Sequence, residues 1–158
     1  MTTPYDRLRQ LGLKLPAPPA AVASYVPTVL TPIGDQRALL FIAGQVPVQD
    51  GKRLTGRCPD EVTVEEAQAA ARVCALNLLA QMEAAAGLDN VEKVAQLTGF
   101  VLSTDDFGEQ PKVLNAASEL LIDVLGDAGR HTRAALGTNA LPFSVTVEIA
   151  AIVVVRTS

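Results

Sequence analysis

Two residues of opposite charge near the C-terminus are the strongest candidates for chemistry in this sequence. Arg133 begins a short apolar segment, and Glu148 interrupts a run of β-branched residues that ends at Val155. If the two segments form an antiparallel hairpin closing between Ala140 and Leu141, Arg133 and Glu148 face each other, because both lie equally far from the turn. Side chains directly across such a ladder lie about 5 Å apart at Cβ. The pattern therefore predicts a cation and a carboxylate in contact within apolar surroundings.

Each residue of this pair has more than one possible role. Arginine stays charged and offers a planar fork that binds a carboxylate through two hydrogen bonds, so in a partly apolar cleft Arg133 would select small acidic substrates. The alternative is a structural ion pair with Glu148, and the pattern favours neither. Because a buried acid needs a partner or water, Glu148 could be the ion-pair partner, a base that orients water, or an acceptor for a substrate hydrogen bond.

Three further residues are weaker candidates. Gly44 ends a predicted strand, and a glycine there either lets a backbone or ligand approach closely or simply forms a bulge or turn. Asn115, near the start of a predicted helix, is expected on pattern alone to be a solvated or capping amide. Tyr25 is expected to be a half-buried aromatic residue of the first strand.

Several other classes of chemistry are disfavoured by the composition. The only histidine, His131, has neither a nucleophile elbow nor an orienting acid, so a catalytic triad is not indicated. One histidine and two cysteines make no metal-binding cluster, and no zinc site is expected. A net charge of −4 and 4% aromatic residues argue against nucleic-acid binding. Without a signal-peptide core or a run long enough to cross a bilayer, we expect a cytoplasmic protein that does not bind membranes.

Hydrophobic periodicity and turn signals predict the elements that must position these residues. We expect residues 1–18 to form a short helix and an extended arm, and residues 19–158 to form a single domain. Long helices are predicted between the capping box that starts at Thr63 and Gly87, and between Pro111 and Gly126. Strands are predicted at 24–30, 37–43, 91–103 and in the final hairpin. This order indicates an α+β fold with one mixed sheet and both long helices on one face.

The final strand has a consequence for assembly. Its odd-numbered residues from Val145 to Val155 are apolar, and its even-numbered residues are nearly as apolar apart from Thr146 and Glu148. Two helices can cover only one face of a sheet, and an exposed apolar second face would exceed what monomers usually carry. We therefore expect the chain to form oligomers through its sheet, with sites between subunits.

Four segments of the sequence resemble the RidA/YjgF family, also called the L-PSP family. They occur in the family's order and at close to its spacings: Ser24-Tyr25-Val26, the run from Phe41 to Val48, the run from Val113 to Ala116, and Arg133 followed by Leu141-Pro142 and Val147-Glu148. The resemblance covers residues 19–156. It implies a chorismate-mutase-like α+β fold assembled as a homotrimeric barrel, with the sheets inside and clefts between subunits.

The resemblance also implies an activity. Members of the archetypal branch hydrolyse reactive enamines and imines, such as 2-aminoacrylate, to 2-keto acids and ammonia without a metal or an organic cofactor. Their substrate is a small molecule that carries a carboxylate. By this resemblance Arg133 would hold the carboxylate, and Glu148 would position the attacking water or share a proton with the imine. The cleft would further contain Tyr25, Gly44, Asn115 and the main chain of Ala135, some of them from the neighbouring subunit.

The sequence departs from the family pattern at several points. Ala43 and Ala135 replace a serine and a cysteine common in the archetypal branch, residues 126–131 are built differently, and the N-terminal arm is an addition. These departures bear on substrate identity and on access to the cleft. An alternative function is non-catalytic binding or sensing of small carboxylic acids such as 2-keto acids. Endoribonuclease or translation-inhibitor activity, mentioned in the family's names, is less favoured for this acidic chain.

Overall fold

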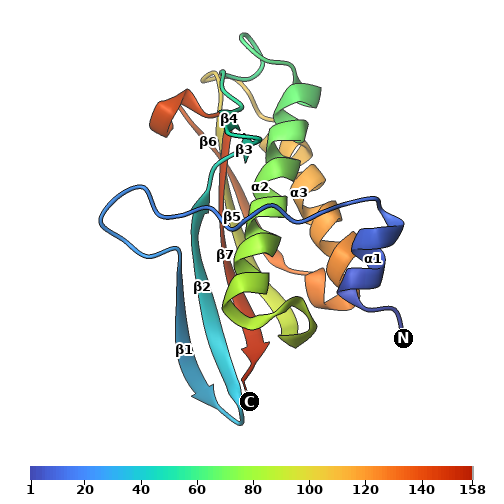
Figure 1. The fold of residues 1–158 in the computed structure, drawn as a ribbon. Coiled ribbons are helices and arrows are strands. Elements are labelled where there is room, and N and C mark those ends of the chain that lie inside the picture. The colour runs from blue at the N-terminus through green and yellow to red at the C-terminus, as the bar shows by residue number, and fades with distance from the viewer. Residues whose placement is uncertain (158) are drawn as a thin grey trace.

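A computed structural model of the protein describes residues 1–157 and places five strands in one mixed sheet (Figure 1). The strands are β1 (Thr28–Gly34), β2 (Arg37–Gln45), β5 (Val91–Leu102), β6 (Thr132–Thr138) and β7 (Val147–Arg156). A small hairpin stands apart, formed by β3 (Val48–Gln49) and β4 (Lys52–Arg53). The helices are α1 (Pro4–Gln10), α2 (Val64–Ala86) and α3 (Gln110–Leu125), and the 3-10 turns are η1 (Leu88–Asn90), η2 (Gly126–Gly129) and η3 (Pro142–Ser144).

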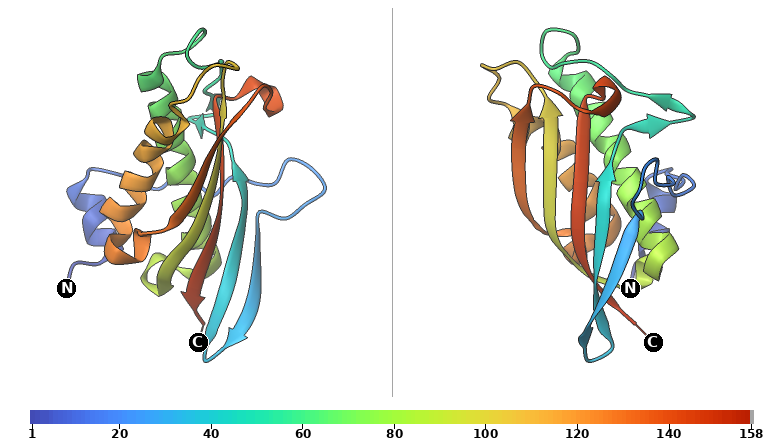
Figure 2. Two further views of the ribbon diagram at one scale, coloured as in Figure 1. Left: turned by 180° about the vertical axis from the view of Figure 1, so that it is seen from behind. Right: turned by 90° about the vertical axis from the view of Figure 1, so that its left-hand side faces the viewer.

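The two long helices lie against the same face of the sheet. Figure 2 shows α2 and α3 side by side in one layer and the strands in a second layer, with α1 at the outer side of α3. The strand order is β1-β2-β7-β5-β6, and only β5 and β6 run parallel. This confirms the predicted α+β architecture with both long helices on one face. The sheet of a single chain is open and does not close into a barrel. The homotrimeric barrel therefore remains a prediction.

Helix boundaries follow the predicted capping signals. The Thr63 hydroxyl accepts from the Glu66 backbone N–H at 3.1 Å, and the Glu66 carboxylate accepts from the Thr63 backbone N–H at 2.7 Å. This reciprocal box satisfies two donors that the first turn of a helix leaves free. Gly87 ends α2 at a φ of 81°. The buried face of α2 is rich in alanine, which lets the helix lie close to the sheet.

The predicted hairpin between the last two strands is wrong. β5 lies between β6 and β7: it pairs in parallel with β6, where Leu97 is opposite Arg133, and antiparallel with β7, where Phe100 is opposite Glu148. The physical reason is the crossover through α3. A strand, a helix and a following strand form a unit whose strands run parallel, so β6 occupies one edge of β5 and β7 occupies the other.

The first strand begins later than predicted. β1 starts at Thr28, directly after Pro27, and Tyr25 lies in a bend before the strand with 47% of its surface exposed. Residues 23–25 form a bend and belong to the arm instead of the sheet. The predicted role of Tyr25 as a strand aromatic is therefore wrong.

One face of the sheet is apolar and uncovered. The odd-numbered residues of β7 are buried, whereas its even-numbered residues from Glu148 to Val154 are only partly buried. Phe41 and Leu136, on β2 and β6, add exposed apolar surface of 40% and 46%. The apolar second face that the sequence predicts is thus present, and the oligomer that would cover it remains a prediction. Among the described residues, no helix combines the length and apolar character that crossing a membrane requires.

Candidate functional site

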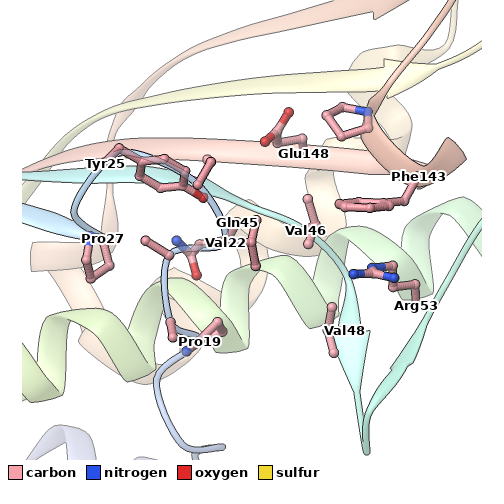
Figure 3. Close-up of a pocket in the computed structure, with 15 residues that line it drawn as sticks. Pro19, Val22, Tyr25, Pro27, Gln45, Val46, Val48, Arg53, Phe143 and Glu148 are labelled. Atoms are coloured by element: carbon pink, nitrogen blue, oxygen red, sulfur yellow. The ribbon is translucent and has the colours of Figure 1, made fainter.

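A cavity of about 710 Å³ lies beside Glu148 (Figure 3). We call it the arm pocket, because residues 19–27, which continue the N-terminal arm past its predicted end at residue 18, form one wall, opposite the end of β2, the β3–β4 hairpin and η3. The walls are largely apolar, and the charged side chains that line the cavity are Arg53 and Glu148. Its volume is typical of small-molecule sites. The arm pocket contains three residues of the predicted site, Tyr25, Gly44 and Glu148.

Gly44 allows the Glu148 carboxylate to lie directly against β2. A Cβ atom at position 44 would be 2.6 Å from Oε1 of Glu148 and 2.9 Å from its Cδ. The pairing of β2 with β7 also shifts between Ile42 and Gln45, so Gly44 sits in an irregular part of the ladder. Both interpretations of this glycine, close approach and bulge, therefore apply, and the group that approaches within the chain is Glu148.

The Glu148 carboxylate has no ion-pair partner in the described part of the chain. No ion pair or hydrogen bond of its carboxylate occurs within residues 1–157. Burial raises the pKa of this carboxyl group, because a low-dielectric environment disfavours the charged form. A carboxyl group with a raised pKa, facing a cavity, can both accept a proton from water and return it.

The arm wall of the pocket is fixed to α2 and β2. The Gln81 side-chain amide donates to the backbone carbonyl of Pro19 at 2.7 Å, and the Ala43 N–H donates to the carbonyl of Pro27 at 3.0 Å. On the far side of the cavity, the Arg53 guanidinium stacks on the Phe143 ring at 3.9 Å from its centroid. Phe143 adopts a left-handed backbone conformation with φ of 56°, which is unusual for a bulky residue.

Arg133 lies on the other side of the sheet, against α3. Its Nη1 donates to Asn115 Oδ1 and to Ser118 Oγ, each at 3.0 Å, and its Nη2 donates to the Pro111 carbonyl at 3.3 Å. The three acceptors follow the spacing i, i+4, i+7 and so lie on one face of the helix. The structure thus brings Arg133 and Asn115 together, at an open cavity of about 340 Å³. Ala135, two residues further along β6, is half-buried and lies opposite Gly99.

His131 is bonded to this cluster. Its Nε2 lies 2.8 Å from Ser118 Oγ, and its Nδ1 lies 2.6 Å from the Gly129 carbonyl oxygen. Burial is the main cause that lowers the pKa of His131; the positive charges of Arg133 and Lys93 lower it further, and the bond to Gly129 opposes them. The ring is therefore neutral at pH 7, with a serine and not an acid as its neighbour.

Arg133 and Glu148 do not meet within one chain. Leu97, opposite Arg133, and Phe100, opposite Glu148, are three residues apart on β5, so the two side chains project from opposite faces. Two strand spacings and three residue rises separate their Cα atoms by roughly 14 Å. The structural ion pair is therefore wrong, because β5 intervenes. The predicted site residues form two clusters, one around Glu148 and one around Arg133.

Several residues of these two clusters were not predicted from the sequence. Ser118 has a recognisable signal, since it falls three residues after Asn115 on the same helical face. Arg53, Phe143 and Gln81 carry no such signal, because their positions depend on how a hairpin, a turn and the arm meet in space. Within residues 1–157, no group of three or more histidine, cysteine or acidic side chains could hold a metal ion, and Cys58 and Cys74 are buried free thiols.

Comparison with known proteins identifies relatives along nearly the whole chain. Residues 5–153 match the family model described as "YjgF/chorismate_mutase-like, putative endoribonuclease". Protein TCP17 of Trypanosoma cruzi is 46% identical in an alignment of 149 residues, and the match covers 92% of this chain and 90% of TCP17. The crystal structure of Atu1372, a protein of unknown function from Agrobacterium tumefaciens, is 45% identical with a TM-score of 0.83, covering 95% of this chain and 91% of that one.

A third relative has been solved with a small molecule. Escherichia coli TdcF with bound serine is 29% identical, with a TM-score of 0.62, and covers 88% of this chain and 93% of that one. The family model covers both long helices and the sheet up to residue 153 of β7, and the relatives at 46% and 45% identity match more than nine-tenths of the chain. On this evidence, in agreement with the resemblance in sequence, the chain belongs to the YjgF/chorismate mutase-like family.

Proposed function

We propose that this protein hydrolyses enamines and imines of small 2-keto acids, of the 2-aminoacrylate type, to the keto acid and ammonia. Family membership supports a role in processing small molecules, and the arm pocket has the size for one. The observation that carries the proposal is Glu148: its carboxylate lines the cavity and forms no ion pair within residues 1–157, and burial raises its pKa. An acid of this kind is suited to moving protons between water and a leaving amine.

The separation of Arg133 from Glu148 is consistent with sites shared between subunits. A substrate of a few carbon atoms cannot span roughly 14 Å and two faces of a sheet. β6, which carries Arg133, is an edge strand, and the uncovered sheet face beside it is apolar. We therefore propose a homotrimer in which Arg133 and Asn115 of one copy lie beside the arm pocket of the next.

In this arrangement the chemistry needs few groups. Arg133 binds the substrate carboxylate through two N–H donors. Glu148 accepts a proton from water as the oxygen bonds to the imine carbon, which is already electrophilic. Glu148 passes this proton to the imine nitrogen, which gives a carbinolamine. A second proton then moves from the carbinolamine hydroxyl through Glu148 to the amine, so the C–N bond breaks and ammonia leaves as the C=O bond forms. Holding water and substrate in contact supplies much of the acceleration.

The proposal is tested with 2-aminoacrylate generated in situ by a dehydratase. Release of keto acid should be faster with the protein than without it. General acid–base residues typically contribute about 10²–10⁴-fold, so Glu148→Gln should lose at least about 100-fold in kcat/KM. Arg133→Ala should lose a comparable factor by releasing the carboxylate. Equal rates for the wild type, both variants and the protein-free control would refute the proposal.

A second function is non-catalytic binding of small carboxylic acids in the same cleft. The observation that favours it is the relative solved with serine, a small molecule with a carboxylate. Calorimetric binding of 2-keto acids, lost in Arg133→Ala and unaccompanied by turnover of 2-aminoacrylate, would establish it. Metal-free RNA cleavage that is lost in Arg133→Ala would instead support the endoribonuclease description of the family.

A further inference from the structure

A chain of hydrogen bonds connects Arg133 to the protein backbone through two side chains. Arg133 Nη1 donates to Ser118 Oγ at 3.0 Å, Ser118 Oγ lies 2.8 Å from His131 Nε2, and His131 Nδ1 lies 2.6 Å from the Gly129 carbonyl oxygen. The mechanism proposed above uses Arg133 but assigns nothing to Ser118 or His131. Both side chains are partly buried, so their polar atoms gain from defined partners.

The Gly129 carbonyl oxygen determines which atom donates and which accepts in each of these hydrogen bonds. A carbonyl oxygen only accepts, so the proton of the neutral imidazole must be on Nδ1, which donates to Gly129. Nε2 is then an acceptor and takes the hydrogen of the Ser118 hydroxyl. With its own hydrogen directed to His131, Ser118 Oγ presents its lone pairs to the Arg133 guanidinium. His131 is therefore the residue that makes Ser118 an acceptor for arginine.

The terminal acceptor of the chain is itself held firmly. A Cβ atom at Gly129 would be 2.3 Å from the backbone oxygen of Leu121 and 2.9 Å from the Cα of Ile122, so only glycine fits against α3 here. This close packing fixes the Gly129 carbonyl relative to the helix that carries Ser118. Both ends of the Ser118–His131 pair are thus anchored to α3, and their separation is set by the fold.

The bonds to α3 leave one part of the guanidinium free. Arginine has five N–H donors, and three of the bonds described above, to Asn115, Ser118 and Pro111, use both hydrogens of Nη1 and one of Nη2. Nε–H and one Nη2–H have no partner within residues 1–157. Two donors are what a carboxylate requires for bidentate binding.

We propose that Ser118 and His131 are positioning residues for substrate binding: neutral His131 orients the Ser118 hydroxyl, and Ser118 holds the Arg133 guanidinium so that Nε–H and the free Nη2–H face the substrate carboxylate. This inference rests on the proposed role of Arg133 in carboxylate binding. It assigns a function to the stretch 126–131, in which the sequence departs from the family pattern, because that stretch supplies Gly129 and His131.

The first test is binding of 2-oxobutyrate, a stable carboxylate probe, measured by calorimetry on the full chain. Ser118→Ala should raise the Kd about tenfold, since one of three bonds to a charged group is lost. Ser118→Thr retains the hydroxyl and should restore most of the affinity. Glu119→Gln changes the neighbouring exposed residue of α3 and should bind as the wild type does. Thermal unfolding of each variant checks that the fold is intact.

Kinetics provide a readout that a purely structural role would not move. With 2-aminoacrylate, Ser118→Ala should raise KM about tenfold and leave kcat within about twofold, because the lost interaction acts on the carboxylate and not on the reacting carbon. A fall in kcat with unchanged KM would overturn the inference. If Ser118→Ala binds 2-oxobutyrate like the wild type while Arg133→Ala does not bind it, the inference fails and the proposed function stands.

The single histidine allows a direct spectroscopic test. Nitrogen-15 spectra of the free protein should show the proton of neutral His131 on Nδ1. The charged groups that act on this ring are Arg133 and Lys93, and both lower its pKa. A bound 2-oxobutyrate would offset the charge of Arg133, so the His131 pKa should rise on binding in the wild type and not in Arg133→Ala. A proton on Nε2 would overturn the inference. A wild type that neither binds 2-oxobutyrate nor acts on 2-aminoacrylate would remove the proposed function together with it.

Discussion

The carboxylate of Glu148 occupies the space that a side chain at Gly44 would need. This relationship joins two strands and explains why position 44 is a glycine without reference to a turn: Oε1 of Glu148 would be 2.6 Å from a Cβ atom there. The acid is thus held over the backbone of β2 at the wall of the arm pocket. The position of the Glu148 carboxylate therefore requires glycine at position 44, because alanine would place a methyl group in the same space.

Gly44→Ala should therefore displace Glu148 and reduce kcat/KM for 2-aminoacrylate by at least about tenfold, since small misplacements of catalytic groups are costly. The carboxylate is the end of a flexible side chain, so the loss of stability should be small. Gly108→Ala is a matched control, because nothing lies within 4 Å of a Cβ atom at Gly108. Full activity of Gly44→Ala would show that Glu148 need not lie where the structure places it.

Glu148→Gln should stabilise the fold while removing activity. Burial raises the pKa of Glu148, so the folded state holds this proton more tightly than the unfolded chain does. The ionised group therefore lowers stability above the folded pKa, and the penalty vanishes below the ordinary value of 4.5. The stability gain of Glu148→Gln should be full at pH 7 and should shrink as the pH falls through this range. Urea unfolding at fixed protein concentration over a pH series measures it, with Glu119→Gln as an exposed control. A stability gain of Glu148→Gln that increases toward acid pH would contradict the prediction.

Charge on the uncovered sheet face should prevent assembly. Phe41→Asp places a carboxylate on this face, where burial against a second copy would leave it unpaired at a cost of several kcal/mol. Light scattering after gel filtration should give a trimer for the wild type and a monomer for the variant, with activity lost in parallel. Ala69→Asp adds the same charge at an exposed position of α2 and should stay trimeric. A wild-type monomer that hydrolyses 2-aminoacrylate would refute the shared site.

Substitutions at Phe143 can distinguish the contribution of backbone strain to stability from that of side-chain packing. Its φ of 56° costs a residue with a side chain roughly 1–2 kcal/mol, which glycine does not incur. Phe143→Gly and Phe143→Ala both remove the ring stacked on Arg53, but only glycine relieves the strain. The free energy of unfolding should thus be about 1 kcal/mol higher for Phe143→Gly than for Phe143→Ala. Both variants should show a raised KM because a wall of the arm pocket is gone, and equal stabilities would argue against strain at this position.

The sequence predicts the local parts of this fold well because their signals are local. The capping box at Thr63, the stop at Gly87 and the start of α3 near Pro111 each involve residues within one or two turns, and the structure confirms them. Strand pairing is not local. The antiparallel pairing of Arg133 with Glu148 fails because adjacent segments need not pair when a third strand, β5, can satisfy both.

In the candidate site, too, local features are predictable from the sequence and contacts between distant segments are not. At Gly44 the residue type predicts either a close approach or a bulge, and the structure is needed to show that Glu148 is the approaching group. The partnership of Asn115 with Arg133 emerges once the register of β6 against α3 is known. The arm pocket could not be anticipated, since its walls come from segments such as Pro19 and Arg53 that meet only in the folded chain. The physical limit is that periodicity reports which face of an element is buried, not what faces it.

The arm that walls the pocket is attached to the rest of the protein by backbone acceptors. The bonds that hold it go from the Gln81 amide and the Ala43 N–H to carbonyl oxygens of Pro19 and Pro27, and a carbonyl is present whatever the side chain is. Residues 20–23, which face the cavity, can therefore be exchanged while these attachments persist. Substitutions in residues 20–23 can therefore change which ligands the arm pocket accepts without disturbing the sheet. They would leave Glu148, the acid of the proposed chemistry, in the same position.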